Sequence, residues 1–199
     1  MGKIILGVTI TLDGFAEDIN RSVNDLYSDL ELLKETEYMN ESIISTGAVV
    51  MSKKEFEMAD DPDLYADHYE YQVPIFIFTD KKPNKHPKET DKISFTFVTG
   101  GVESAIIQAK VAAGDKDVNI IGSAETTQLC LRTNLVDELQ VDIIPLFLHQ
   151  GYRPFEALAD FDHKLERVLV KELPSGRTHI RYKFINNVVE VRWNINRIC

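Results

Sequence analysis

Hydrophobic and polar residues follow two periodicities along the chain, one typical of buried strands and the other of amphipathic helices. Six short runs rich in apolar residues predict strands of a sheet, because strands covered on both faces are apolar almost throughout. They occupy residues 3–12, 43–51, 73–79, 94–98, 118–121 and 138–145. Residues 163–185 alternate apolar and polar positions on either side of a turn at Pro174–Gly176, which predicts an antiparallel hairpin.

The spacing of apolar residues predicts about four helices between these strands. The first covers residues 25–39, where four apolar side chains share one face: Leu26, Leu30, Leu33 and Met39. The others are predicted over residues 102–113, closed by Gly114, over residues 124–133, and over a short stretch that begins near Ser52.

No linker rich in Pro, Gly or Ser interrupts the chain, so we predict a single domain over residues 1–186. Its fold class is α/β, with a mixed sheet of about eight strands, about four helices and a C-terminal hairpin. For residues 187–199 we favour no functional role; an extra edge strand and a dimer contact are the alternatives.

The chain of 199 residues is acidic, with 32 Asp and Glu against 22 Lys and Arg and a net charge of −10. Such a surface repels phosphate backbones and anionic lipids, so we expect neither nucleic acid nor a membrane as partner. Cys130 and Cys199 have no metal-ligand or redox spacing and are predicted to be reduced thiols. The absence of a signal-peptide pattern or an apolar run of about 20 residues predicts a cytoplasmic protein.

Four predicted loops follow apolar strands at their carboxyl ends, where open α/β sheets bind ligands. They are residues 11–14 (TLDG), 51–54 (MSKK), 79–82 (TDKK) and 122–124 (GSA). Two of them open helices, whose free N–H groups attract phosphate, and two carry lysines. Each loop alone is an ordinary turn, cap or solvated surface; together they predict a cradle for a pyrophosphate-containing cofactor.

Four strings of the sequence resemble the dihydrofolate reductase-like family, in particular the branch containing the reductase domain of riboflavin biosynthesis. They are LDGFAED, VVMSKKEFEM, VTGGVESAIIQAKVAAGDKDVNIIGSAETTQLCL and LVDELQVDIIPLFLHQGYRPFE. The resemblance extends from residue 3 to about residue 185 and implies a three-layer sandwich. It further implies that NADPH binds along the carboxyl ends of the strands and passes a hydride to a heterocycle.

The resemblance also implies which residues bind each part of NADPH. Thr9 and Ala16, with Glu17, correspond to positions beside the nicotinamide, and Thr79 and Lys81 to positions beside the adenosine. The implied phosphate contacts are Ser52, Lys53, Gly122, Ser123, Ala124, Thr126 and Thr127. Asp29 corresponds to the carboxylate with which dihydrofolate reductase holds its pterin and assists protonation, so it is the implied catalytic residue; its alternative is an exposed helix carboxylate.

The chain departs from the family pattern at the phosphate positions. Ser52 and Lys53 replace a Gly-Arg pair, so that a bidentate guanidinium is lost. Glu55 replaces a threonine and brings a negative charge, while Ser123 replaces the second glycine of a Gly-Gly turn. Residues 148–151 (LHQG) replace a Gly-rich segment. These changes predict a lower affinity for the cofactor phosphate.

Two functional hypotheses therefore remain. The first is an NADPH-dependent oxidoreductase that reduces a pteridine-like or pyrimidine-like heterocycle, of the dihydrofolate reductase or 5-amino-6-(5-phosphoribosylamino)uracil reductase type in riboflavin biosynthesis. The alternative is a non-catalytic ligand-binding protein with a degenerate dinucleotide site. A self-association scaffold is a weaker third possibility, and the resemblance implies a homodimer in every case.

Other polar residues have simpler interpretations. Asp13 is divided evenly between function and a turn cap, and Asp25 is favoured as an ordinary helix residue. No metal site is predicted, because the histidines lie far apart and none forms an i, i+4 pair. They are predicted on the surface or in loops, although His149 lies near the presumed cofactor. The predicted substrate pocket is lined by Leu26, Leu30, Leu33 and Phe56.

Overall fold

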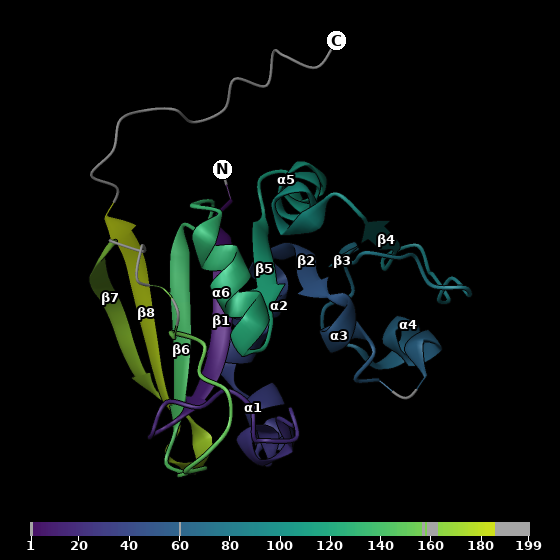
Figure 1. The fold of residues 1–199 in the computed structure, drawn as a ribbon. Coiled ribbons are helices and arrows are strands. Elements are labelled where there is room, and N and C mark those ends of the chain that lie inside the picture. Colours follow the sequence, from purple (N-terminus) through teal and green to yellow (C-terminus); the bar gives the residue numbers. More distant parts are fainter. Residues whose placement is uncertain (1, 60, 157, 159–162, 186–199) are drawn as a thin grey trace.

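The computed structural model describes residues 2–59, 61–156, 158 and 163–185. Within these residues eight strands form one sheet (Figure 1): β1 Ile4–Thr11, β2 Thr46–Ser52, β3 Ile75–Phe78, β4 Phe95–Val98, β5 Asp117–Ile121, β6 Glu138–Ile144, β7 Lys164–Glu172 and β8 Thr178–Ile185. The α-helices are α1 Leu30–Lys34, α2 Glu37–Ser45, α3 Lys53–Phe56, α4 Tyr65–His68, α5 Gly101–Ala113 and α6 Ala124–Arg132. Short 3-10 turns are η1 Asn24–Tyr27, η2 Pro62–Leu64 and η3 Pro174–Gly176. The predicted tail, residues 187–199, lies outside the described residues.

The sheet is parallel at its centre and antiparallel at one edge, as predicted. Its strand order is β4-β3-β2-β5-β1-β6-β8-β7. The strands from β4 to β6 pair in parallel, and β8 pairs antiparallel with both β6 and β7. The hairpin of β7 and β8 turns at η3, where the sequence predicts the turn.

Two hydrophobic clusters cover the two faces of the sheet because side chains alternate along each strand. On β2, Ala48 and Val50 point into the cluster beneath α5 and α6. Val49 and Met51 point into the other cluster, which α2, α3 and α4 cover. The result is a three-layer sandwich with helices on both faces (Figure 1).

The predicted helix over residues 25–39 is divided into η1, α1 and α2. A new helix begins after Thr36, whose hydroxyl accepts a hydrogen bond from the Met39 amide at 3.1 Å. Helix α2 then continues through Ser45, so β2 begins three residues later than predicted. The apolar spacing of residues 25–39 is satisfied by short turns packed on the sheet, which a periodicity argument cannot distinguish from one helix.

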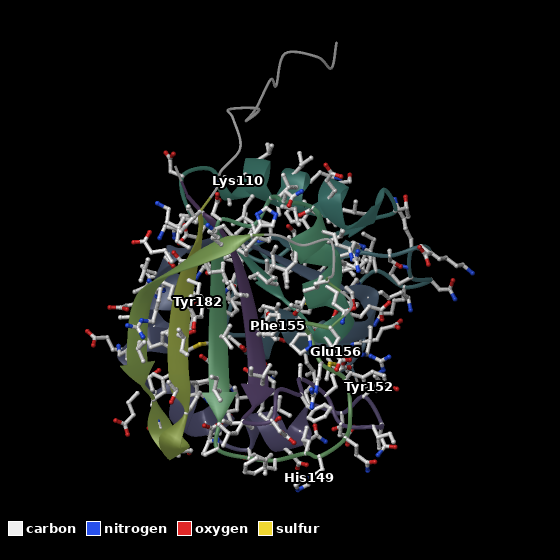
Figure 2. All side chains as sticks on the ribbon, turned by 60° about the vertical axis from the view of Figure 1, so that its left-hand side comes forward. Lys110, His149, Tyr152, Phe155, Glu156 and Tyr182 are labelled. Carbon is white, nitrogen blue, oxygen red and sulfur yellow. The ribbon has the colours of Figure 1, made fainter. Side chains whose placement is uncertain are left out.

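The carboxyl ends of the parallel strands lie together along one rim of the sheet, and α3 and α6 begin at this rim. Figure 2 shows His149 at this edge and Lys110 at the opposite end of the sheet. The site-forming loops therefore meet at the edge that the sequence predicts. No helix in the described part of the chain is both long and apolar enough to span a membrane.

Candidate functional site

The carboxyl ends of β2, β3 and β5 border a groove of about 390 Å³, which we call the α3–α6 groove. Six predicted cofactor residues line it: Ser52, Lys53, Thr79, Lys81, Ser123 and Thr126. Five of these residues come from three of the four predicted loops, and Thr126 follows on α6, so the structure brings those loops together.

Three more predicted residues belong to the start of α6. Gly122 and Ala124 flank the N-cap residue Ser123, and a side chain at Gly122 would collide with Thr126. Thr127 is fully buried, and its hydroxyl has no hydrogen-bond partner among the described residues. The glycine therefore lets β5 turn closely against α6.

Thr9 and Ala16, predicted beside the nicotinamide, are both buried outside the α3–α6 groove. The Ala16 amide donates to the Tyr152 carbonyl at 2.9 Å. The Thr9 hydroxyl lies 3.4 Å from an Arg177 nitrogen and belongs to the polar cluster around Asp29.

The Glu55 carboxylate lies beneath the α3–α6 groove and contacts three residues that line it. Its Oε1 atom accepts hydrogen bonds from the Ser123 amide at 3.0 Å and the Ser123 hydroxyl at 2.5 Å. Its Oε2 atom accepts from the Ser52 amide at 3.0 Å and from the Ser52 hydroxyl. The Thr126 hydroxyl lies within 3.2 Å of both oxygens. Glu55 thus completes a capping box on α3 and also caps α6.

Glu55 is held in its ionised form. Burial alone would raise the pKa of its carboxyl, but hydrogen bonds from Ser123, Ser52 and Thr126 outweigh burial and lower the pKa below its ordinary value. A buried negative charge therefore lies where the first N–H groups of α6 point.

A second carboxylate, from Glu17, also faces the start of α6. Glu17 is fully buried, and its Oε2 atom lies 3.3 Å from the Ala124 amide and 3.3 Å from an Arg21 nitrogen. Its Oε1 atom is paired with the Lys54 ammonium. Glu17 thereby joins the loop after β1 to both α3 and α6.

The lysines at the groove differ in their pairing. Lys53 pairs with Glu57, and Lys54 pairs with Glu17. Lys81 forms no salt bridge with any described residue. Two of the three ammonium groups that could receive a phosphate are thus already matched by carboxylates of the chain itself.

Asp29, the predicted catalytic residue, forms a buried ion pair with Arg177. The Asp29 side chain is 8% exposed and that of Arg177 is 0% exposed. Arg177 Nη2 lies 2.6 Å from Asp29 Oδ1, and Nε lies 3.3 Å from Oδ2. Nη2 also donates to the Leu26 carbonyl at 2.8 Å. Asp29 precedes α1 as its N-cap without a side-chain capping bond, so it is not the exposed helix carboxylate of the alternative interpretation.

Further buried groups extend this cluster. Asp142 Oδ2 lies 3.5 Å from Arg177, and Oδ1 lies 2.7 Å from His179 Nδ1. Because a carboxylate only accepts, Nδ1 carries the proton of this bond. The Tyr38 ring packs 4.4 Å from the His179 ring, and burial together with the Asp142 charge raises the pKa of Tyr38. The prediction that the histidines lie on the surface or in loops is wrong for His179, which is fully buried in β8.

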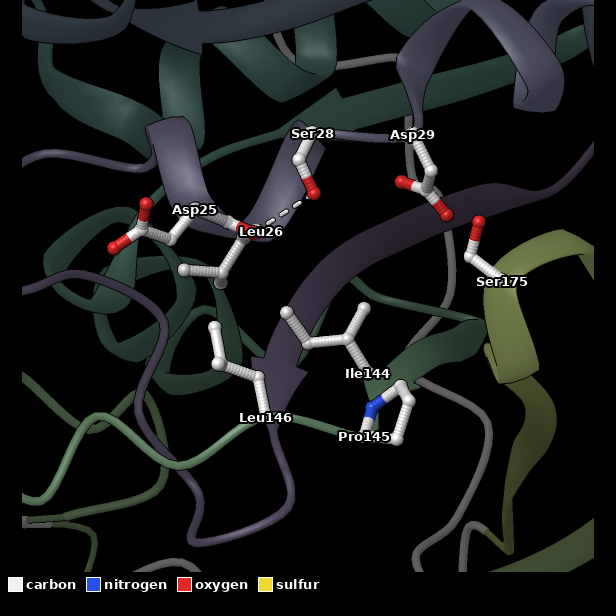
Figure 3. Close-up of a pocket in the computed structure, with 8 residues that line it drawn as sticks. All are labelled: Asp25, Leu26, Ser28, Asp29, Ile144, Pro145, Leu146 and Ser175. Atoms are coloured by element: carbon white, nitrogen blue, oxygen red, sulfur yellow. Dashed lines mark hydrogen bonds between the residues drawn. The ribbon is translucent and has the colours of Figure 1, made fainter.

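A pocket of about 320 Å³ opens beside Asp29 at the carboxyl end of β6. In Figure 3 the Asp29 carboxylate and the Ser175 hydroxyl point toward one another, and Asp25 lies on the other side of the pocket. The remaining lining residues are Leu26, Ser28, Ile144, Pro145 and Leu146. A carboxylate at the margin of an apolar pocket can bind the N–H groups of a flat ring.

The residues predicted to line the substrate pocket lie in different parts of the structure. Leu26 lines the pocket, whereas Leu33 is buried and Phe56 packs in the hydrophobic core against Tyr65, Phe95 and Phe97. Phe56 is buried in that core, while the preceding residue of the short helix α3, Glu55, contacts the start of α6.

Asp13 is a structural residue of the loop after β1. It accepts hydrogen bonds from the Thr11 hydroxyl at 2.6 Å and from the amides of Leu148 and His149 at 3.3 and 2.8 Å. Burial opposes its ionisation, but these bonds lower the pKa of Asp13. The His149 side chain is exposed, and its backbone φ is 63°. Asp13 therefore ties two loops together at the rim.

Arg177, Asp142 and His179 are the polar residues that the sequence analysis missed. Arg177 and His179 stand in an alternating segment after a turn, a context in which charged residues normally face solvent. Residues 177 and 179 share one face of the hairpin, and Asp142 lies opposite His179 on the neighbouring strand. This arrangement could have indicated a buried polar cluster, but only if the pairing of β6 with β8 had been known.

Comparison with solved structures identifies the fold. A candidate riboflavin biosynthesis protein from Shewanella sp. PV-4 is 20% identical, with a TM-score of 0.71 over 92% of this chain and 99% of that chain. A diaminohydroxyphosphoribosylaminopyrimidine deaminase/5-amino-6-(5-phosphoribosylamino)uracil reductase from Thermotoga maritima is 12% identical, with a TM-score of 0.63 over 92% of this chain and 57% of that chain. Dihydrofolate reductase from Enterococcus faecalis, solved with NADP(H), is 14% identical, with a TM-score of 0.59 over 93% of this chain and 98% of that chain.

No protein-family model and no curated protein matches the chain. The structural similarities nevertheless confirm the predicted fold: this chain has the dihydrofolate reductase-like fold, which it shares with reductases of riboflavin biosynthesis. At these identities the similarity establishes the fold and leaves the activity to the residues of the site.

The residues at the start of α6 do not fit a cofactor phosphate. A phosphate there would use the Ser123 amide and the hydroxyls of Ser123 and Thr126, all of which already donate to Glu55. We therefore derive no chemical step through NADPH.

Among the described residues, no group of three or more His, Cys, Asp or Glu side chains could hold a metal ion.

Proposed function

We propose that this chain is a ligand-binding protein on a reductase fold, and that it binds a small nitrogen heterocycle of the pteridine or pyrimidine type beside Asp29. The observation that carries this proposal is the nearly buried Asp29 carboxylate, held by Arg177 at the margin of a pocket of about 320 Å³. The volume is in the range of small-molecule sites.

The contacts of Asp29 suit recognition of a ring that carries N–H donors. Each carboxylate oxygen accepts one hydrogen bond from Arg177 and has a second lone pair left for a ligand. Three apolar side chains, those of Leu26, Ile144 and Leu146, would contact the faces of a flat ring. Because the guanidinium is buried, it holds the carboxylate in one orientation before the ligand arrives.

Of the two functional hypotheses, the non-catalytic alternative has the stronger support. The NADPH-dependent hypothesis requires a nicotinamide cofactor held at the rim of the sheet, and the phosphate position there faces the carboxylates of Glu55 and Glu17. The substrate end has no comparable obstruction, since the Asp29 pocket is open. A protein that binds a heterocycle without turning over NADPH accounts for both observations, the occupied phosphate position and the open Asp29 pocket.

Thermal-shift and calorimetric titrations with folate, dihydrofolate, flavin and 5-aminouracil test the proposal. A bound ligand at 100 times its dissociation constant stabilises the fold by about 2.7 kcal/mol, which raises the melting temperature measurably. We expect binding by the wild type and by Asp25→Asn, which removes an exposed carboxylate of the same pocket, and loss of binding in Asp29→Asn.

Ser28→Phe provides a second variant that leaves the buried ion pair intact. Ser28 is exposed and lines the pocket, so a phenyl group there should obstruct the pocket without disturbing Arg177. Equal ligand affinity in the wild type, Ser28→Phe and folded Asp29→Asn would contradict the proposal.

We also propose that the chain forms the expected homodimer, through β7. This edge strand exposes apolar side chains, and its unpaired backbone groups can accept another strand; those side chains are Leu165, Val168, Leu169 and Val170. Light scattering should show a dimer for the wild type and a monomer for Val168→Lys; a monomeric wild type would contradict this assignment.

A further inference from the structure

We infer that Glu55 acts as an internal substitute for a ligand phosphate and determines which ligands the α3–α6 groove can accept. The carboxylate occupies the anion position at the start of α6, so the groove excludes phosphate-bearing dinucleotides. This inference deepens the non-catalytic part of the proposed function, on which it rests, whereas heterocycle binding beside Asp29 is tested separately.

The position of Glu55 is the position of an anion in an α/β fold. Helix α6 follows β5 directly at the carboxyl edge of the sheet, where helix N–H groups and the helix dipole favour a negative group. The Ser123 amide and both hydroxyls, of Ser123 and Thr126, converge on Glu55 Oε1 at 2.5–3.2 Å. These are the donors with which α6 would bind a phosphate oxygen, and a carboxylate already satisfies them.

Glu55 is also fixed from its own helix. It belongs to the single turn of α3, and its Oε2 atom accepts hydrogen bonds from the Ser52 amide and hydroxyl. Moving the carboxylate aside would leave buried donors at α6 and part-buried donors at Ser52 without partners, which is costly. The Glu55 side chain is therefore a fixed part of the rim that a ligand cannot easily displace.

The surrounding charges oppose a second anion. Glu17 faces the next N–H group of α6, from Ala124, so two buried carboxylates share the helix start. The nearby ammonium groups of Lys53 and Lys54 are paired with Glu57 and Glu17. A pyrophosphate would thus meet like charge at short range without two of the cations that normally offset it.

Calorimetric titration with NADPH and with inorganic pyrophosphate tests the inference in four proteins: the wild type, Glu55→Thr, Glu55→Gln and Glu41→Gln. Threonine removes the charge and supplies a hydroxyl, whereas glutamine removes the charge and keeps the size. Glu41→Gln is the control for net charge, because Glu41 is an exposed carboxylate on α2 that does not line the α3–α6 groove.

We expect no NADPH binding by the wild type at millimolar concentration and a gain in affinity of at least about tenfold for Glu55→Thr. Glu41→Gln should stay within about twofold of the wild type, although its net charge changes equally. Pyrophosphate should follow the same order, which separates phosphate exclusion from effects on the nicotinamide or adenine.

The amide resonance of Ser123 provides a readout that does not depend on ligand binding. In the wild type it should shift as acid protonates Glu55, and in Glu55→Gln this titration should disappear. Tight NADPH binding by the wild type, or folded Glu55→Thr and Glu55→Gln proteins that bind NADPH no better than the wild type, would overturn the inference. Either result would leave heterocycle binding beside Asp29 to be judged by its own titrations.

Discussion

Arg177 and Asp29 form a buried ion pair at 2.6 Å although 148 residues separate them in the sequence. The pair joins the turn after β7 to the N-terminus of α1, and Arg177 also contacts Asp142 on β6. A single guanidinium therefore pairs with carboxylates from two elements and sets the geometry of the Asp29 pocket. Arg177 is a positioning residue of the proposed ligand site.

Replacing Arg177 with methionine should destabilise the fold by about 3–5 kcal/mol, because Asp29 and Asp142 would remain buried without their cation. Urea unfolding followed by circular dichroism measures this loss. Arg153→Met is the control, since that guanidinium is 45% exposed and should cost no more than about 0.5 kcal/mol. Similar losses in the two variants would contradict the role assigned to Arg177.

Glu55 should make the fold sensitive to acid. Its folded-state pKa lies below the ordinary value of 4.5, because hydrogen bonds from Ser123 and Ser52 overcome the opposing effect of burial. A lowered folded-state pKa contributes stability that is complete above the unfolded-state pKa and is lost as the pH falls through the folded-state pKa. The free energy of unfolding should thus decline more steeply below pH 4.5 in the wild type than in Glu55→Gln. The exposed Glu125 supplies the control: Glu125→Gln should retain the wild-type slope.

Gly151→Ala should be strongly destabilising, by at least about 2 kcal/mol. The backbone φ of Gly151 is 144°, and a Cβ there would collide with the carbonyl of Glu17. The neighbouring Tyr152 amide donates to that same carbonyl at 2.9 Å, so the collision would displace the loop carrying Glu17. Gly14→Ala tests the contribution of φ alone, because Gly14 has a φ of 86° with nothing within 4 Å of the added Cβ. Thermal unfolding should show a much smaller loss for Gly14→Ala; equal losses would argue against the collision.

Cys130 should be unreactive in the folded protein. Burial, with a smaller contribution from the Glu55 charge, raises the pKa of the Cys130 thiol to about 12, so almost no thiolate is present near neutral pH. Iodoacetamide at about pH 8 should label Cys130 only in denaturing urea, as peptide mass spectrometry can resolve. Rapid labelling of the native protein would show that the α6 face opens readily.

Much of the α3–α6 groove was predictable because its residues follow strands in the sequence. The runs before Ser52, Thr79 and Gly122 identify parallel strands, and parallel strands bring their carboxyl ends to one edge. The departure at Glu55 was also visible, as a carboxylate where a hydroxyl was expected. What the sequence could not provide was the geometry of Glu55, since its partner Ser123 lies 68 residues away on another helix.

Local pattern was sufficient for the strands, the hairpin, the larger helices and the rim, because periodicity and turn residues act over a few positions. It was insufficient for the division of residues 25–39 into short turns and for the cluster of Arg177, Asp29, Asp142 and His179. Those four side chains come from β6, from β8 and its preceding turn, and from the segment before α1. Their burial is possible only because the folded chain places opposite charges together, and no local signal distinguishes such residues from solvated ones.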